Sequence, residues 1–326
     1  MEMNLRTSLL LILAILTTEA THAEFAVPFA VQNQNPFVST HGLPRYASAN
    51  VLGSGESQID LSYAVASNFE SGSTPLEQIR LDGESERWGL RYLRGVGNGW
   101  EVGVDVPFVK HSGGYLDGVI INWHDWFGLP QGGRDQTAQR QFEYAYVGAD
   151  GRVAFGEGSG LGDMQWLIGK TLHAADDAAT VVRGHFKLPT GDEDQLLGSG
   201  GVDLGVTLHH VRQLQAKWSV GLSVGATYLS EGDVLPQQTR PFVGHAGGFT
   251  SYAATERLRL TVQWDVHSQV FDDTRLRQLN EIAYVLSFGA DMKFGPSNVR
   301  FAVVENYPHP KITPDVAFFL EGQWRT

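Results

Sequence analysis

Apolar and polar side chains alternate along most of the chain after Gly55, so that every second residue is apolar. One clear stretch has its apolar positions at Trp100, Val102, Val104, Val106 and Phe108. A second stretch, 257–267, repeats the rhythm with charged and polar residues between the apolar ones. A period of two residues is typical of a β-strand with one apolar and one polar face. The pattern recurs as far as Trp324 and predicts about twelve strands.

The connections between these segments differ in length at the two ends of the expected sheet. One end has short joints near 95–99, 174–177, 215–216, 256–257 and 295–297. The other end has longer ones near 71–76, 112–160, 190–200, 230–240, 272–280 and 307–313. Alternation alone would also fit a soluble β-sandwich, but this asymmetry with an even strand number is typical of bacterial outer-membrane barrels. We therefore expect an all-β fold, an antiparallel transmembrane β-barrel of about twelve strands.

Aromatic side chains gather near both ends of the predicted strands. The short-joint end carries Tyr92, Trp100, Trp218, Phe294 and Trp324. The long-loop end carries Phe69, Phe108, Tyr228 and Phe242. Two such girdles are expected where a barrel crosses the two membrane–water interfaces.

The N-terminus has the three parts of a secretory signal peptide: Arg6, an apolar run from Leu9 to Leu16, and Thr21-His-Ala23 before the cut. Eight apolar residues are too few for a spanning helix, which needs about 20. The expected organisation is a signal peptide (1–23), a periplasmic N-terminal segment against or inside the barrel mouth (24–55), and the barrel (56–326). The expected location is the outer membrane of a Gram-negative bacterium, among membrane lipid, lipopolysaccharide and the barrel-assembly machinery.

Composition removes several classes of function. The 326 residues include 24 Lys and Arg against 36 Asp and Glu, a net charge of −12, which argues against a nucleic-acid partner. There is no cysteine, which excludes a disulfide scaffold, a cysteine metal cluster and a thiol nucleophile. The 38 glycines suit a fold with many turns and small wall positions.

If the apolar face meets lipid, the polar face lines the lumen, and it carries both signs of charge. The candidate lumen-lining residues are Arg87, Arg91, Glu101, Asp105, Asp163, Arg183, His185, Lys187, Asp203, Arg259, Asp265 and His267. Folding the hairpin about 190–200 sets Lys187 opposite Asp203, and the 174–177 turn brings Asp163 near Lys187. Such charges either fix the register of the wall or line a narrow polar pathway without strong charge selectivity, and both readings stay open.

The loop 112–160 is the longest connection, and loops of that length are usually functional or disordered. Apolar residues between 115 and 127 recur at helical spacing, with glycines on both sides, and a small hairpin is expected over 142–155. The candidate gate residues on this helix are Asp117, Trp123, His124, Asp125 and Trp126. The helix could bury its stripe at the barrel mouth or at the lipopolysaccharide interface, and the flanking glycines favour the mouth.

The sequence carries no active-site signature. His111-Ser112, His124-Asp125 and Asp163 could be assembled into a hydrolase, but nothing places nucleophile, base and orienting group together. We predict no catalytic, metal or cofactor-binding residue. The main hypothesis is a narrow channel or transporter for small solutes, gated or plugged by the 112–160 loop. The alternatives are an envelope enzyme acting on lipid or lipopolysaccharide, and a structural or receptor barrel with a closed lumen.

Several motifs resemble a family catalogued as domain of unknown function 3187, found in Gram-negative envelopes. The matching stretches are Ser112-Gly-Gly-Tyr-Leu-Asp117, Trp123-His-Asp-Trp-Phe-Gly-Leu-Pro-Gln-Gly-Gly-Arg-Asp135, Lys187-Leu-Pro-Thr-Gly-Asp192 and Asn35-Pro36-Phe37. The resemblance implies an outer-membrane barrel and assigns no activity. The chain ends Trp324-Arg-Thr326 without a terminal aromatic residue, a departure from barrels generally that bears on recognition by the assembly machinery.

Overall fold

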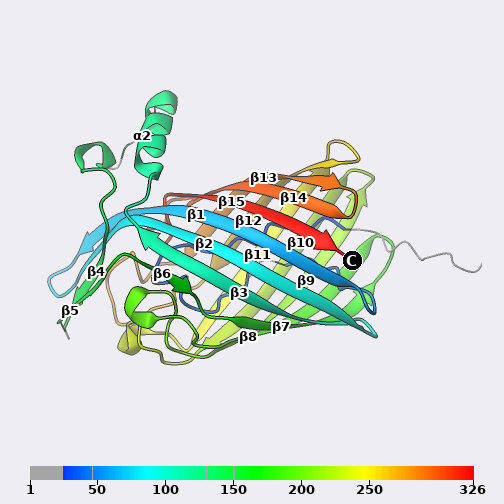
Figure 1. Ribbon diagram of the computed structural model, residues 1–326, viewed down its shortest axis with the longest axis horizontal. Coiled ribbons are helices and arrows are strands. Elements are labelled where there is room, and N and C mark those ends of the chain that lie inside the picture. The colour runs from blue at the N-terminus through cyan, green and yellow to red at the C-terminus, as the bar shows by residue number, and fades with distance from the viewer. Residues whose placement is uncertain (1–24, 46, 129–130, 132, 150) are drawn as a thin grey trace, which may run out of the picture.

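In the computed structural model, the chain forms a closed antiparallel β-barrel (Figure 1). The structure describes residues 25–45, 47–128, 131, 133–149 and 151–326, without the side chains of His124 and Phe127. The predicted signal peptide and its cleavage site lie outside these residues. None of the helices described is long and apolar enough to cross a membrane.

Twelve strands form the wall, as the alternation predicts. β15 pairs with β1 and closes the barrel, while β3 pairs with β7 across the long loop. The wall strands are β1 (Ser57–Ser73), β2 (Gln78–Gly97), β3 (Trp100–Ser112), β7 (Gln165–Ala174), β8 (Ala178–Lys187), β9 (Asp203–Gln215), β10 (Trp218–Leu229), β11 (Phe242–Ala253), β12 (Leu258–His267), β13 (Ala283–Phe294), β14 (Ser297–Glu305) and β15 (Val316–Arg325). Closure gives every wall strand two partners, which a hydrocarbon environment requires.

Alternate side chains of each wall strand point into the lumen and out of the barrel. In β13, Ala283, Val285 and Ser287 are buried against the contents of the barrel. Tyr284 and Phe288, between them, are 41% and 45% exposed on the outside. The same division runs along the other strands, so the outer surface is an apolar band of the kind that lipid covers.

The short turns lie at the end of the barrel where β1 begins. Between β2 and β3, Gly97, Asn98 and Gly99 have φ angles of 91°, 53° and 71°. Glycine reaches this left-handed region freely and asparagine tolerates it, so the chain reverses within two residues. The long loops lie at the opposite, extracellular end, and besides the 112–160 loop two of them carry 3₁₀ turns, Glu193–Gln195 and Pro236–Gln238.

The 112–160 loop contains the predicted helix and the predicted hairpin. Helix α2 (Leu116–Phe127) is followed by a 3₁₀ turn (Arg134–Gln136), the hairpin β4 (Glu143–Gly148) and β5 (Gly151–Phe155), and the short β6 (Gly158–Leu161). At the extracellular end β2 and β3 separate, and there β4 pairs with β2 while β6 pairs with β3. The loop therefore extends the wall outward at this position.

Residues 25–56 are here called the N-terminal segment, and its described residues as far as Leu52 lie inside the barrel. Phe25 packs with Val181 and Val211 near the short-turn end. Phe37 packs among side chains of the extracellular loops, and the N–H of Gly55 donates to the carbonyl of Gly95 near the end of β2. The segment thus rises through the lumen and returns, whereas the sequence analysis expects it only against or inside the barrel mouth.

Candidate functional site: a lumen filled by the chain itself

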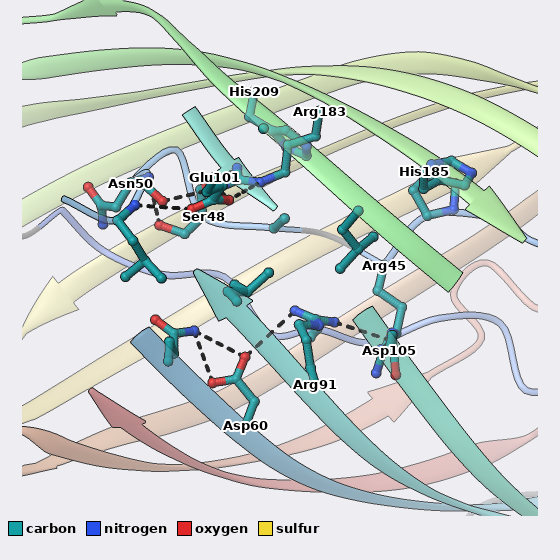
Figure 2. Close-up of a pocket in the computed structure, with 18 of the residues that line it drawn as sticks. Arg45, Ser48, Asn50, Asp60, Arg91, Glu101, Asp105, Arg183, His185 and His209 are labelled. Atoms are coloured by element: carbon teal, nitrogen blue, oxygen red, sulfur yellow. Dashed lines mark hydrogen bonds and ion pairs between the residues drawn. The ribbon is translucent and has the colours of Figure 1, made fainter. Parts of the chain in front are cut away.

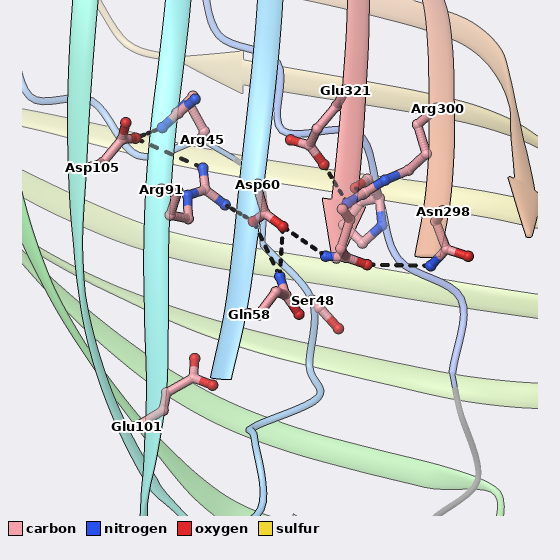
Figure 3. A network of polar contacts seen from close by, with 12 residues as sticks. Arg45, Ser48, Gln58, Asp60, Arg91, Glu101, Asp105, Asn298, Arg300 and Glu321 are labelled. Carbon is pink, nitrogen blue, oxygen red and sulfur yellow. Dashed lines mark hydrogen bonds and ion pairs between the residues drawn. The ribbon is translucent and has the colours of Figure 1, made fainter. Parts of the chain in front are cut away.

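Arg45 of the N-terminal segment joins a charged network on the β1–β3 side of the lumen (Figure 3). Its guanidinium forms an ion pair with Asp105 of β3, and guanidinium nitrogens of Arg87 and Arg91 of β2 lie 3.9 Å from the same carboxylate. Arg91 also lies 3.9 Å from Asp60 of β1. Three guanidinium groups share two carboxylates here, and because all five side chains are buried, salt screens these pairs little.

Arg183 of β8 holds the returning half of the segment (Figure 2). Its guanidinium donates to the main-chain oxygens of Ser48 and, at 3.0 Å, of Asn50. It also pairs with Glu101 of β3 at 2.6 Å, and Glu101 accepts the N–H of Leu52 at 3.1 Å. The wall therefore binds main-chain groups of the segment through charged side chains, and such hydrogen bonds are the stronger kind.

Lys187 of β8 forms a buried ion cluster with two aspartates. Its Nζ lies 2.5 Å from Asp163 and 3.3 Å from Asp203, and it donates to Ser199 Oγ at 2.6 Å. Lys187 and Asp203 are register partners, so the predicted pairing is confirmed. The N–H of Gly42 in the segment donates to Asp203 Oδ2 at 2.6 Å. A Cβ on Gly42 would lie 3.0 Å from the Cβ atoms of Asp203 and Lys187, so glycine allows this close approach.

The rising half of the segment is bound mainly through its backbone. The side-chain amide of Gln263 in β12 accepts the N–H of Phe29 at 2.8 Å and donates to its carbonyl at 3.0 Å. Arg300 of β14 donates to the carbonyl of Pro28 at 2.8 Å. The candidate lumen-lining residues were chosen as charged inward residues of regular strands. That choice missed Gln263 because it is neutral, and Arg300 because its strand is less regular. It missed Arg45 because the N-terminal segment has no periodicity.

The space left in the lumen is small. Cavities of about 80, 50 and 20 Å³ remain between the segment and the wall, the largest beside Arg91, Glu101 and Arg183. A water needs about 10–15 Å³ of such volume, so these cavities suit a few waters and not a solute. Toward the short-turn end the lumen widens into a vestibule of about 630 Å³ beside Phe25 and Lys293.

The extracellular loops cover the other mouth. A buried apolar cluster joins Phe37 at the tip of the segment to Tyr144 of β4, Leu196 of the β8–β9 loop, Phe271 of the β12–β13 loop and Ile312 of the β14–β15 loop. The tip therefore packs against a lid drawn from several loops.

The candidate lumen-lining residues occupy inner positions of the wall. Besides the residues in the networks above, His185 lines the cavity of about 80 Å³, and Asp265 and His267 line that of about 50 Å³. Arg259 shares the inner face of β12 with Gln263 by alternation. That the candidate lumen-lining residues line a conducting pathway stays a prediction.

The helix of the long loop does not enter the mouth. α2 packs through Leu116 and Ile120 on Val65 of β1 and Phe318 of β15, which point out of the barrel. The expectation that this helix folds inward is therefore wrong for the described residues. The reason is physical: the inner wall is polar and already occupied, while the outer wall offers an apolar surface. The candidate gate residues on this external helix are Asp117, Trp123, His124, Asp125 and Trp126.

The hydrolase residues are not assembled into a site in the described part of the chain. His111 bonds to Ser85 Oγ at 3.0 Å and to the carbonyl of Leu196 at 3.1 Å, and Asp163 is bound to Lys187. Ser85 and His111 are both buried, beneath the ring of Tyr144. Across the described ranges, no group of three or more His, Asp or Glu side chains is placed to hold a metal ion.

These features define a twelve-stranded β-barrel with the fold of an outer-membrane protein and with part of its own chain in the lumen. The chain belongs to the DUF3187 family, described as "Protein of unknown function", whose model matches residues 5–325. No curated protein matches the sequence.

One solved outer-membrane channel shares the fold. The COG4313 outer membrane channel of Pseudomonas putida F1 is 13% identical with a TM-score of 0.58, over 86% of this chain and 98% of that one. Two further structures are more distant. The NanC porin is 9% identical with a TM-score of 0.46, over 83% of this chain and 98% of that one. The CymD monoaromatic hydrocarbon channel is 10% identical with a TM-score of 0.40, over 92% of this chain and 94% of that one. At such identities the likeness to the COG4313 channel shows the fold alone.

Proposed function

We propose that the protein is a narrow outer-membrane channel for small polar solutes, and that the N-terminal segment, rather than the 112–160 loop, closes it. The observation that carries the proposal is the course of this segment, which occupies the lumen from the vestibule to the extracellular lid. A twelve-stranded barrel lies between one of about 8 strands, which side chains fill, and one of about 16, which is open. A lumen of this size needs added contents to be closed.

The contacts of the segment are of a kind that water can replace. Gln263, Arg183 and Arg300 bind its backbone oxygens, and each of these polar groups would be hydrated in an open lumen. Both ring nitrogens of His41 are buried without a hydrogen-bond partner among the described residues, an unfavourable arrangement that release would relieve. The polar contacts of the closed state are therefore exchangeable, and the apolar packing of Phe25 and Phe37 adds to them.

The wall that would remain has both signs of charge facing one lumen. Arg87 and Arg91 stand beside Asp60 and Asp105, and Arg183 stands beside Glu101. Closely spaced opposite charges largely cancel at a distance, so the open pathway would favour small polar or zwitterionic solutes over one sign of ion.

Planar-bilayer conductance tests this proposal. The mature protein should show small or rare openings, and a variant lacking residues 25–50 should conduct steadily, with heat-modifiable gel migration as the check on assembly. If the deletion prevents assembly, Arg45→Ala serves instead, because Asp105 keeps Arg87 and Arg91 as neighbours and the barrel loses no wall contact. Assembled variants that conduct no more than the mature protein would overturn the proposal.

A further inference from the structure

The outer side of the barrel carries a second feature, helix α2, which the channel proposal leaves without a role. One edge of its apolar surface, Leu116 and Ile120, is buried on Val65 and Phe318. Val65 points outward because its neighbour in β1, Ala66, packs inside the barrel. The helix therefore rests on the face of the wall that lipid surrounds.

The first turn of α2 is fixed to the wall. The carboxylate of Glu84 in β2 accepts the main-chain N–H groups of Tyr115, at 2.7 Å, and Leu116. Arg134 pairs with Asp117 of the helix at 2.6 Å and with Asp315 before β15 at 2.8 Å. A carboxylate at a helix N-terminus and a guanidinium shared between helix and wall both favour one orientation of the helix.

The level of the helix on the barrel is set by an aromatic row. The rings of Tyr63, Trp88 and Phe108, on β1, β2 and β3, are 5.2 and 5.8 Å apart on the outer face. The hydroxyl of Tyr63 lies 3.1 Å from that of Tyr115, one residue before α2. Aromatic rows of this kind sit at the membrane–water interface. α2 thus begins at the depth of the outer-leaflet headgroups.

A second apolar stripe of α2 faces away from the wall. Val119, Trp123 and Trp126 are 52%, 51% and 80% exposed. At 100° per residue these positions adjoin Leu116 and Ile120, so the two stripes form one continuous apolar arc, with Asp117 and Asp125 across the helix from it. In Figure 1, α2 points away from the barrel, across its long axis. A helix in that direction lies along the membrane plane.

We propose that the stripe of Val119, Trp123 and Trp126 inserts into the outer-leaflet lipid at the boundary between headgroups and acyl chains, so that α2 docks the loop on the membrane surface. The stripe continues the lipid-facing surface of the barrel, and tryptophan suits this boundary. A second copy of the chain is a poor occupant. A stable dimer buries about 800 Å² per partner, more than three partly exposed side chains supply.

Labelled cysteines test this docking, because the chain has no cysteine of its own. Trp126→Cys carries a polarity-sensitive dye on the stripe. Leu76→Cys in the β1–β2 loop is the matched control, since both side chains are 80% exposed. In vesicles of dibromostearoyl phosphatidylcholine, the dye at 126 should be quenched several-fold more than in unbrominated vesicles and shielded from aqueous iodide. The dye at 76 should show the reverse.

Equal iodide quenching at both positions, with no effect of bromine, would overturn the docking. So would shielding at 126 that appears only at high protein-to-lipid ratio, because the occupant would then be a second copy. Trp123→Phe with the dye at 126 keeps an apolar stripe and should retain the lipid signal, whereas Trp123→Asp should lose much of it while assembly on gels stays unchanged.

Discussion

The N-terminal segment and helix α2 of the 112–160 loop settle on opposite sides of the same wall. The N-terminal segment meets the wall largely through backbone groups, as where Gln263 binds Phe29 and Asp203 binds Gly42. Helix α2 meets the wall through its apolar side chains. Both stretches contain apolar residues, but they differ in what they present to the strands.

The difference shows what selects a side in a membrane barrel. Burying a polar wall group without a partner costs about 1–3 kcal/mol, so a stretch that enters the lumen must satisfy the wall's charges and amides. An apolar helix in the lumen would take from Arg183 and Gln263 the backbone partners that the segment gives them. Outside the barrel, the same helix covers apolar surface that needs no hydrogen-bond partner. The polarity of the contact face, more than the hydrophobicity of the segment, therefore decides whether a segment lies inside or outside the barrel.

Paired deletions offer the largest test of this contrast. Removing 25–50 should raise liposome-swelling rates with small sugars by about tenfold or more, because a twelve-stranded lumen without contents approaches the open barrels. Removing 113–133 should leave the rates near those of the intact protein, because this stretch lies outside the lumen. The opposite result, faster swelling only in the loop deletion, would show that the loop and not the N-terminal segment closes the channel.

The buried cluster at Lys187 gives the next largest effect. Asp203→Lys sets two ammonium groups together in a buried site and should lower the free energy of unfolding by roughly 3–5 kcal/mol. Adding Lys187→Asp restores the pair but places a new carboxylate beside Asp163, which lies 2.5 Å from Lys187 Nζ. Urea unfolding in lipid vesicles should therefore show partial recovery. No recovery would mean that the pair contributes nothing to register.

A methyl group on Gly42 probes the fit of the segment alone. Gly42→Ala brings a Cβ to 3.0 Å from two wall Cβ atoms and should weaken closure by ~1–3 kcal/mol, as overpacking does. Open events in bilayer recordings should become more frequent. Gly244→Ala in β11 is the control, because its added Cβ meets nothing within 4 Å. An equal frequency of open events in the two variants would show that the contact at Gly42 does not hold the segment.

The smallest effect concerns the extracellular lid, where loops meet over the segment. Glu77 in the β1–β2 loop accepts hydrogen bonds from Tyr146 Oη at 2.9 Å and from the N–H of Arg275 at 3.0 Å. Burial alone would raise the pKa of Glu77, but these hydrogen bonds and one from Thr274 outweigh it, and the pKa lies below its ordinary 4.5.

A depressed carboxyl pKa contributes stability above its ordinary value and loses it as the pH falls through the folded-state pKa. The protection factor for amide exchange at Arg275 should therefore drop modestly as the pH falls below the ordinary glutamate pKa of 4.5. It should stay flat over the same range in Glu77→Gln. A drop of the same size in both proteins would show that another group titrates.

The wall was predictable from sequence because period-two alternation reports directly which side chains face lipid. Lys187 and Asp203 could be paired because a hairpin folded about its loop fixes its own register. The course of the N-terminal segment could not be predicted, since its contacts with Gln263 and Arg300 use backbone groups that leave no side-chain pattern. The helix was predictable but its side was not, because an apolar stripe does not say which apolar surface it will meet.

The most direct test of closure by the N-terminal segment is a reversible lock. The lock is a disulfide in the double variant Gly42→Cys/Asp203→Cys. Its two Cβ atoms start about 3.0 Å apart, close to the ~3.5–4.5 Å between the Cβ atoms of a disulfide. Lys187 keeps Asp163 as its partner in this variant. Single-channel recordings should show a silent oxidised protein that begins to conduct when reductant is added and falls silent on reoxidation. Gly42→Cys alone should not respond to reductant. Equal conductance in the oxidised and reduced states, with the disulfide confirmed by mass, would contradict closure by this segment.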